Sequence, residues 1–242
     1  MRLSDFDVLT FDVIGTLIDM ETGVLNWARP RILAVNREAR DQDIAESYAN
    51  SQAVVRKADP TLTFTQRQPK IWENMAKTFG VTVGPDDGAL FLASARAWPA
   101  FPDSVAALAQ LKATYRHIIA VTNCDRVSAR CMMRTLGSPF FAIITEQDMG
   151  VSKPDLKAYE YFLNYVASLG VPKERVLHVA QSQYHDMVPA KKIGLASAWI
   201  YRRHGKQGYG TTQAPQEPVR PDFLATSLDG FVRLVEDDLR AR

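Results

Sequence analysis

The side chains best suited to chemistry stand at the ends of short apolar runs. Asp12 directly follows the apolar residues 8–11, and Gly15 and Thr16 come soon after it. A carboxylate in such a place is suited to nucleophilic attack or to proton transfer. Other apolar runs also end in polar residues, which are Thr122, Asn123, Thr145, Glu146, Gln181 and Ser182, with Lys153 shortly after the third run. One such residue alone would be an ordinary loop residue, but several together indicate a site.

These polar groups need strands to place them. The residues that read as strands lie at 8–11, 117–123, 140–145, 175–181 and 196–202, and those that read as the intervening helices at 104–115, 126–137, 154–170 and 186–194. Short apolar strands that alternate with helices predict a parallel sheet covered on both faces. The carboxyl ends of such strands form one edge, where ligands bind. We therefore expect the polar strand ends to meet there.

The region between residues 22 and 98 has helical patterns and hardly any strand-like runs. Four helical segments, with apolar residues three or four apart, are expected at 22–40, 41–58, 65–80 and 86–98. Because the first strand belongs to the sheet, this region is an insertion. The predicted fold class is α/β, with a Rossmann-like core over residues 1–18 and 100–242 and an inserted helical-bundle cap over residues 19–99. A helix over residues 228–242 is expected to end the core.

The composition excludes several classes of protein. The 242 residues carry a net charge of +2, and their basic residues are scattered, which gives no case for nucleic acid or a membrane surface as partner. No stretch is long and apolar enough to span a bilayer, and the N-terminal residues do not read as a signal peptide. The two cysteines form no disulfide framework or zinc signature. We expect a soluble, cytoplasmic protein.

The motifs, in this order, resemble those of the haloacid dehalogenase superfamily. The stretch DVIGTL, from Asp12 to Leu17, is similar to its first motif, in which Asp and two further residues precede Gly-Thr-Leu. Thr122 resembles the second motif and Lys153-Pro154 the third. The stretch HVAQSQYHD, which ends at Asp186, resembles the acidic fourth motif. The resemblance covers the whole core, and the cap matches it as a helical insertion of the right size.

Two departures from the phosphatases of this superfamily narrow the resemblance. Phosphatases have a second Asp two residues after the first, as a general acid, and a further acid in the fourth motif. Here these places hold Ile14 and Gln181. Magnesium prefers hard oxygen ligands, usually carboxylates. The pattern is similar to the L-2-haloacid dehalogenase (type II) branch, which implies a hydrolase that needs no metal or other cofactor.

That branch acts on a small 2-substituted carboxylic acid, and displacement of halide from carbon needs no proton donor. The resemblance implies that Asp12 attacks carbon 2 and forms an aspartyl ester, which water then hydrolyses at the Asp12 carbonyl. It implies that Lys153 keeps Asp12 ionised, and that Asp186 either partners Lys153 or orients the water. The implied activity is that of an (S)-2-haloacid dehalogenase, which converts a 2-haloacid and water into a 2-hydroxyacid and halide.

Further residues are expected to act on Asp12 or on the substrate. The hydroxyls of Thr16 and Thr122 would orient either Asp12 or the substrate carboxylate. The backbone N–H groups of Val13 and Ile14 are further anion donors, and the amide of Asn123 is expected beside the departing group. Gln183 stands where the branch has Asn, and His185 where it has an aromatic residue. His185 is open to three interpretations: a base, a donor on the halide side, or a polar loop residue. His178, inside a predicted strand, is expected to be a core residue.

The branch also uses one cap arginine to grip the halide. No arginine falls cleanly in the matching stretch, IAESYANSQAVVRKAD, and Arg29 and Arg31 are expected to substitute for it. Asp19 and Glu21 stand at the cap hinge, where an acid would suit a substrate with an amine. This motivates an alternative, an L-azetidine-2-carboxylate hydrolase that opens the strained ring by the same chemistry.

Two other classes remain as alternatives. A magnesium-dependent phosphatase is disfavoured by Ile14 and Gln181, and a non-catalytic binding module would have no need for Asp12, Lys153 and Asp186 together. The expected partner is a small-molecule carboxylate substrate, and a homodimer is possible, since dimers are frequent in proteins that resemble this one.

Overall fold

A computed structural model describes residues 1–241 of the chain, and its centre is one parallel sheet. Six strands lie in the spatial order β3-β2-β1-β4-β5-β6. Their bounds are β1 (Val8–Phe11), β2 (His117–Thr122), β3 (Ala142–Thr145), β4 (Val176–Ala180), β5 (Ala196–Ile200) and β6 (Phe223–Ala225). The predicted α/β class is confirmed, and all five predicted strands are present.

The central strands are buried on both faces, which explains their nearly continuous apolar sequences. In β1, Val8 packs into one hydrophobic core, while Leu9 and Phe11 pack into another. The first core is covered by α8 (Leu156–Ser168) and α9 (Val188–Lys192). The second is covered by α5 (Ser104–Thr114), α6 (Arg126–Thr135) and α10 (Leu228–Arg240). Arg242, the last residue of the predicted terminal helix, lies outside the described residues.

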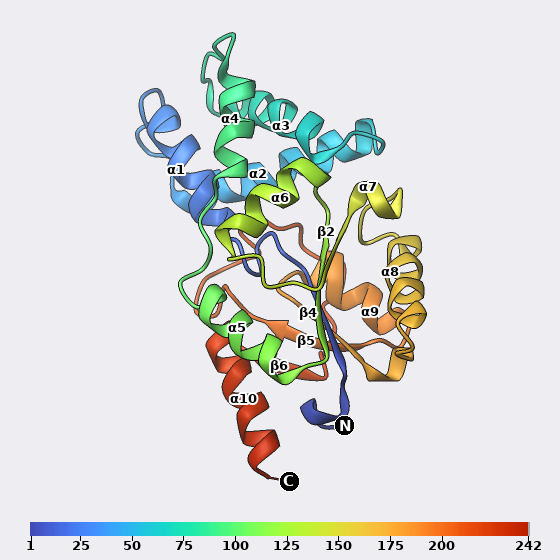
Figure 1. Cartoon of the computed structure of the whole chain (residues 1–242). Helices are drawn as coiled ribbons and strands as arrows, with labels where there is room; N and C mark the ends of the chain where they lie inside the picture. The colour runs from blue at the N-terminus through green and yellow to red at the C-terminus, as the bar shows by residue number, and fades with distance from the viewer. Residues whose placement is uncertain (242) are drawn as a thin grey trace.

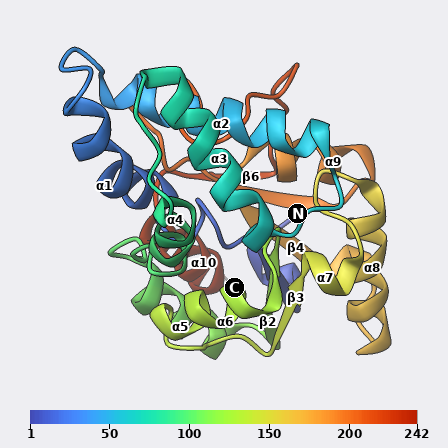
Figure 2. The same ribbon diagram turned by 90° about the horizontal axis from the view of Figure 1, so that it is seen from above.

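Four helices stand over the carboxyl ends of the strands, at the end of the molecule opposite the two termini (Figures 1 and 2). They are α1 (Met20–Leu33), α2 (Asp41–Ala58), α3 (Phe64–Phe79) and α4 (Asp87–Arg96). The segments by which the chain enters and leaves this region lie side by side: the N–H of Asp19 donates to the Pro99 carbonyl at 2.7 Å. The four predicted cap helices are present, whereas the division into two domains stays a prediction. No helix within residues 1–241 is long and apolar enough to cross a bilayer.

A buried ion pair ties α3 to the short helix α7 (Glu146–Met149), which follows β3. The Arg67 Nη2 atom lies 2.7 Å from Glu146 Oε2, and both side chains are buried. The same Nη2 donates to the Asn123 carbonyl at 3.1 Å, and the Phe64 N–H donates to Glu146 Oε1 at 2.5 Å. The cap is thereby joined to the loops that follow β2 and β3.

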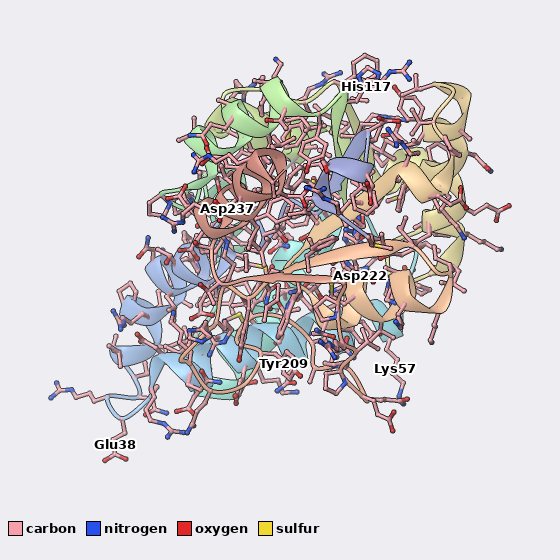
Figure 3. All side chains as sticks on the ribbon, turned by 90° about the horizontal axis from the view of Figure 1, so that it is seen from below. Glu38, Lys57, His117, Tyr209, Asp222 and Asp237 are labelled. Carbon is pink, nitrogen blue, oxygen red and sulfur yellow. The ribbon has the colours of Figure 1, made fainter. Side chains whose placement is uncertain are left out.

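Residues 201–222, which join β5 to β6, form a second contact with the cap that the sequence patterns did not predict. Figure 3 shows Tyr209 of this segment beside the cap helices drawn in blue. Arg203 is buried, pairs with Glu21 of α1, and donates from Nη2 to Gln42 of α2 at 2.7 Å. This loop therefore closes a side of the cap–core junction.

Candidate active site

The residues that follow three neighbouring strands meet beneath the cap. Asp12 follows β1, Asn123 follows β2, and the π-helix η3 (Gln183–Met187), which carries Asp186, follows β4 by two residues. Because β1 lies between β2 and β4, these strand ends adjoin. The Ser182 hydroxyl accepts from the His185 N–H at 2.9 Å and caps the π-helix. Single turns of this kind are frequent at functional sites.

Lys153 is the centre of the site. It is fully buried, and its Nζ lies 3.0 Å from Asp12 Oδ1, 2.6 Å from Asp186 Oδ1 and 3.0 Å from the Val121 carbonyl oxygen. An ammonium group has three donor hydrogens, and three acceptors use all of them. The structure thus brings Asp12, Lys153 and Asp186 together in one buried cluster.

The two carboxylates have different electrostatic environments. Burial raises the pKa of Asp12 and outweighs the opposing effect of the Lys153 charge, so the pKa lies above its ordinary value. Burial also raises the pKa of Asp186, but Lys153 and the hydrogen bond from His178 outweigh it, and the pKa falls below its ordinary value. The ammonium pKa of Lys153 is raised by both carboxylates against the effect of burial. Lys153 therefore lowers the pKa of Asp12 without overcoming burial, and the expectation that it keeps Asp12 ionised stays a prediction.

Thr16 and Asn123 hold this cluster in place. The Thr16 hydroxyl donates to Asp12 Oδ2 at 2.7 Å and accepts from the Gln181 N–H at 2.9 Å. The Asn123 side chain receives the Lys153 N–H at 2.8 Å and donates to the Lys153 carbonyl at 2.8 Å. Thr16 thus orients Asp12, while Asn123 fixes the Lys153 backbone and also lines the pocket.

A pocket opens above Asp12, between the core, α2 and the 201–222 loop. Its empty space is about 500 Å³, which includes part of its opening to solvent. The core lines it with Asp12, Ile14, Asn123, Ser182, His185 and Asp186, the cap with Met20, Tyr48, Gln52, Arg56 and Phe64, and the loop with Thr211 and Thr212. The core, the cap and the loop therefore all contribute to the wall of this pocket.

Arg56 is the cap arginine of this pocket. It belongs to the stretch IAESYANSQAVVRKAD, and the expectation that no arginine falls cleanly there was wrong. Its Nε is buried and has no hydrogen-bond partner among residues 1–241. Burial, together with the Arg67 charge, lowers its pKa to about 10, so it remains charged at neutral pH. Tyr48, Gln52 and Arg56 follow one another at intervals of four on α2, and all three line the pocket. Residues four apart share a helix face, and this polar stripe was the available signal.

The expectation that Arg29 or Arg31 serves as the cap arginine of the site was wrong. Arg29 is exposed, and its Nε donates to Asp41 at 2.7 Å, on the surface between α1 and α2. Arg31 lies over the Trp27 ring, with its Cζ 3.4 Å from the ring centre. Neither lines the pocket. Both lie in the last turns of α1, far along the helix from its first residue, Met20.

Two other expected substrate contacts do not face the pocket. Gln183 is buried and holds the 201–222 loop: its side chain receives the Val219 N–H at 3.0 Å and donates to the Val219 carbonyl at 3.2 Å. The Thr122 hydroxyl is buried and donates to Cys124 Sγ at 3.4 Å. The expectation that Gln183 and Thr122 contact the substrate directly was therefore wrong. The Val13 side chain packs in the core and Ile14 lines the pocket, while the role of their backbone N–H groups stays a prediction.

His185 does line the pocket, as a neutral imidazole. Burial, then the nearby Arg56 charge, lowers its pKa to about 3. Its Nδ1 lies 3.1 Å from the Ser182 hydroxyl. When that hydroxyl donates to Nδ1, the proton of His185 is on Nε2. Among the three interpretations of His185, this arrangement favours a neutral donor.

The acids expected at the cap hinge have other partners. Asp19 caps α1 by accepting from the Thr22 N–H at 3.0 Å. Glu21 pairs with Arg203 and with Lys206, the latter at 3.2 Å. Neither acid lines the pocket above Asp12. The charged group that the cap contributes there is the cation Arg56.

The site's residues do not fit a magnesium centre. Ile14 and Gln181 stand at the places of the missing acids, and Gln181 Oε1 accepts from the Thr212 hydroxyl at 3.3 Å. The Lys153 ammonium bridges the remaining carboxylates. The described residues contain no group of three His, Cys, Asp or Glu side chains suited to a metal ion. Independence from metal stays a prediction about activity.

Solved structures share this fold. The L-2-haloacid dehalogenase from Xanthobacter autotrophicus with chloropropionic acid covalently bound matches with a TM-score of 0.74 and 19% identity, over 96% of this chain and 98% of that chain. The HAD-hydrolase YfnB from Bacillus subtilis, bound to magnesium, matches with a TM-score of 0.70 and 17% identity, over 98% and 100%. At these identities the likeness shows the fold alone.

Curated relatives and a family model complete the comparison. The chain is 25% identical to the pyrimidine 5'-nucleotidase YjjG of Escherichia coli (strain K12) over 197 residues, 79% of this chain and 83% of that protein. It is 24% identical to the glyceraldehyde 3-phosphate phosphatase of Methanocaldococcus jannaschii over 139 residues, 57% of each. Residues 6–194 match the model of the haloacid dehalogenase-like hydrolases, and the chain therefore belongs to this family of enzymes.

Proposed function

We propose that the protein hydrolyses a small 2-substituted carboxylic acid through an ester on Asp12, as an (S)-2-haloacid dehalogenase. The observation that carries this proposal is a buried Asp12 bonded to Lys153, with the apolar Ile14 where a phosphatase has its acid. Halide leaves with its bonding electron pair and needs no proton. A phosphoryl-transfer enzyme without that acid would have no protein group there to protonate its leaving alcohol.

The first step is displacement at carbon 2. An Asp12 oxygen forms a bond to this carbon as the carbon–halogen bond breaks, and the configuration inverts. The charged Arg56 is suited to bind an anion, either the substrate carboxylate or the departing halide. His185, a neutral donor that lines the same pocket from the core, would add a hydrogen bond to that anion.

The second step is hydrolysis of the ester. Water attacks the Asp12 carbonyl carbon, and Asp186 accepts a proton from it. The bond between that carbon and the substrate oxygen breaks, this oxygen takes the proton from Asp186, and the 2-hydroxyacid leaves with the oxygen that came from Asp12. Asp12 keeps the oxygen of the water.

The azetidine alternative uses the same ester but a nitrogen leaving group. Its motivation was an acid near the pocket, and Asp19 and Glu21 are engaged elsewhere. A cationic Arg56 favours an anionic group over an ammonium group. We therefore place L-azetidine-2-carboxylate second, and the phosphatase activity of the curated relatives third.

The experiment is a single turnover in ¹⁸O-labelled water with enzyme in excess, with and without EDTA. The substrates are (S)- and (R)-2-chloropropionate, L-azetidine-2-carboxylate and, with added Mg²⁺, a pyrimidine nucleoside monophosphate. We expect unlabelled product from the (S)-acid, one ¹⁸O atom in the Asp12 peptide, and no effect of EDTA. Label in the first-turnover product would mean direct attack by water. Turnover of the phosphate ester alone, lost on chelation, would assign the protein to the phosphatases.

A further inference from the structure

A buried histidine outside the pocket contacts the active-site carboxylate. His178 lies in β4 and is fully buried. Its Nε2 lies 2.9 Å from Asp186 Oδ1, and its Nδ1 lies 2.8 Å from the Thr10 hydroxyl. The ring stacks on Phe162 at 5.6 Å and meets Tyr159 edge-on at 5.8 Å. His178 is thus held by two polar contacts and two aromatic rings.

The hydrogen-bond partners assign the protons of this histidine. An ionised carboxylate only accepts hydrogen bonds, so Nε2 carries a hydrogen that points to Asp186. In the neutral ring, Nδ1 then accepts from the Thr10 hydroxyl. Thr10 and His178 are paired residues of the neighbouring strands β1 and β4, which sets their side chains next to each other. The order of contacts is therefore Thr10, His178, Asp186 and Lys153.

These contacts leave the two oxygens of Asp186 unequal. Oδ1 receives hydrogen bonds from Lys153 at 2.6 Å and from His178 at 2.9 Å. Oδ2 is buried and has no hydrogen-bond partner among residues 1–241. Asp186 lines the pocket above Asp12. Oδ2 is therefore the oxygen available to a water molecule there.

We propose that His178 is a positioning residue for ester hydrolysis, which holds Asp186 so that Oδ2 accepts the proton of the attacking water. Lys153 contacts both carboxylates and serves both steps. Of these two carboxylates, His178 contacts only that of Asp186. The water oxygen bonds to the Asp12 carbonyl carbon, and its proton passes to Asp186 Oδ2. The bond from that carbon to the substrate oxygen then breaks, and the proton passes on to this oxygen. The inference rests on the proposed function and adds a division of labour between the two steps.

The test separates the two steps with His178→Phe, which keeps an aromatic ring between Phe162 and Tyr159. Enzyme is mixed with (S)-2-chloropropionate and the reaction is quenched at intervals. Mass spectrometry of the protein then measures the fraction that carries the Asp12 ester at each time. We expect ester to form at close to the wild-type rate and to hydrolyse about 10- to 100-fold more slowly, part of the 10²–10⁴ that a general base contributes. The variant should accumulate the Asp12 ester.

Three further variants separate positioning from packing. His178→Gln keeps a donor for Asp186 and should recover part of the hydrolysis rate. Thr10→Val removes the Nδ1 contact and should slow hydrolysis by less than His178→Phe. Phe162→Leu loosens the packing without touching a hydrogen bond and should leave the ratio of the two rates unchanged. If His178→Phe does not fold, the Gln and Val variants carry the test through the same ratio.

The contradicting outcomes are distinct. Ester that forms and hydrolyses at wild-type rates in the His178 and Thr10 variants would overturn this inference alone. Equal slowing of both steps would assign His178 a purely structural role. No ester on Asp12 in the wild-type protein would overturn the proposed function, and this inference with it.

Discussion

Lys153 Nζ lies 3.0 Å from Asp12 Oδ1 and is shared with Asp186 at 2.6 Å, so a single buried ammonium serves two buried carboxylates. The cluster of these three groups carries a net negative charge when all are ionised. Burial makes that charge costly, and the raised pKa of Asp12 is its consequence. The ionised form of Asp12, which the nucleophile needs, is thus the form that the fold disfavours. Such a conflict between stability and activity is common at functional sites.

Replacement of Asp12 by Asn should abolish turnover without loss of stability. In the folded protein the pKa of Asp12 is raised above its ordinary value of 3.8, so ionising it opposes folding. That cost is absent below the unfolded pKa and complete above the folded pKa. Asn removes it, and the variant should melt at an equal or higher temperature at pH 7. The advantage should shrink as the pH falls towards 4. Substantial activity in a homogeneous Asp12→Asn sample, checked by mass, would disprove the assignment of the nucleophile.

Lys153→Met should be nearly as damaging, through the chemical step. An opposite charge at this distance lowers a carboxylate pKa by about 1–3 units, and its loss should move the acid limb of the pH–rate profile upward by that amount. Activity should recover partly at higher pH, where Asp12 ionises. The control is Lys157→Met, an exposed lysine of the following helix. An unshifted profile with near-normal turnover would show that another group keeps Asp12 ionised.

Arg56→Leu should lower kcat/KM for the haloacid by about 10- to 100-fold, because a hydrogen bond to a charged group contributes about 1.5–3 kcal/mol. The matched control is Arg29→Leu, since Arg29 is the exposed arginine paired with Asp41. It should change kcat/KM by less than about twofold. Steady-state kinetics of both variants decide between the two arginines. Loss of activity in the Arg29 variant alone would restore the original expectation.

Arg67→Met should destabilise the protein by about 3–5 kcal/mol, because it leaves Glu146 buried without its charged partner. Denaturant unfolding measures the difference. Arg29→Met breaks an exposed pair and should cost about 0–1 kcal/mol. Equal effects of the two substitutions would mean that the α3 contact with Glu146 adds little to stability.

Most of the fold was predictable because its signals are local. Apolar runs of strand length, separated by helical patterns, identified five strands, and the cap helices followed from their apolar spacing. The strand β6 was missed, since it has only three residues, Phe223 to Ala225, after a long connection. A short edge strand of this kind depends on pairing with β5 more than on its own sequence.

The residues of the site also fall into those that the sequence indicated and those that only the packing revealed. Asp12 and Lys153 were found because each follows a predicted strand, where sequence position determines spatial position, and Asp186 was found through the resemblance of the fourth motif. Arg56 and Thr212 reach the same pocket from a cap helix and from the 201–222 loop. Their approach depends on how these segments pack on the core, and Arg29, a chemically suitable residue, faces solvent instead.

By itself, the sequence determined the α/β order and the polar edge with Asp12 and Lys153, because these follow from residue type and from the shared edge of parallel strands. The resemblance of its motifs added Asp186 and the meaning of the apolar Ile14. Only the tertiary structure decided which arginine enters the pocket, that Gln183 holds a loop, and that His178 contacts Asp186. These depend on the angles at which helices and loops meet the sheet and on hydrogen bonds between strands far apart in the chain, and no local pattern encodes either.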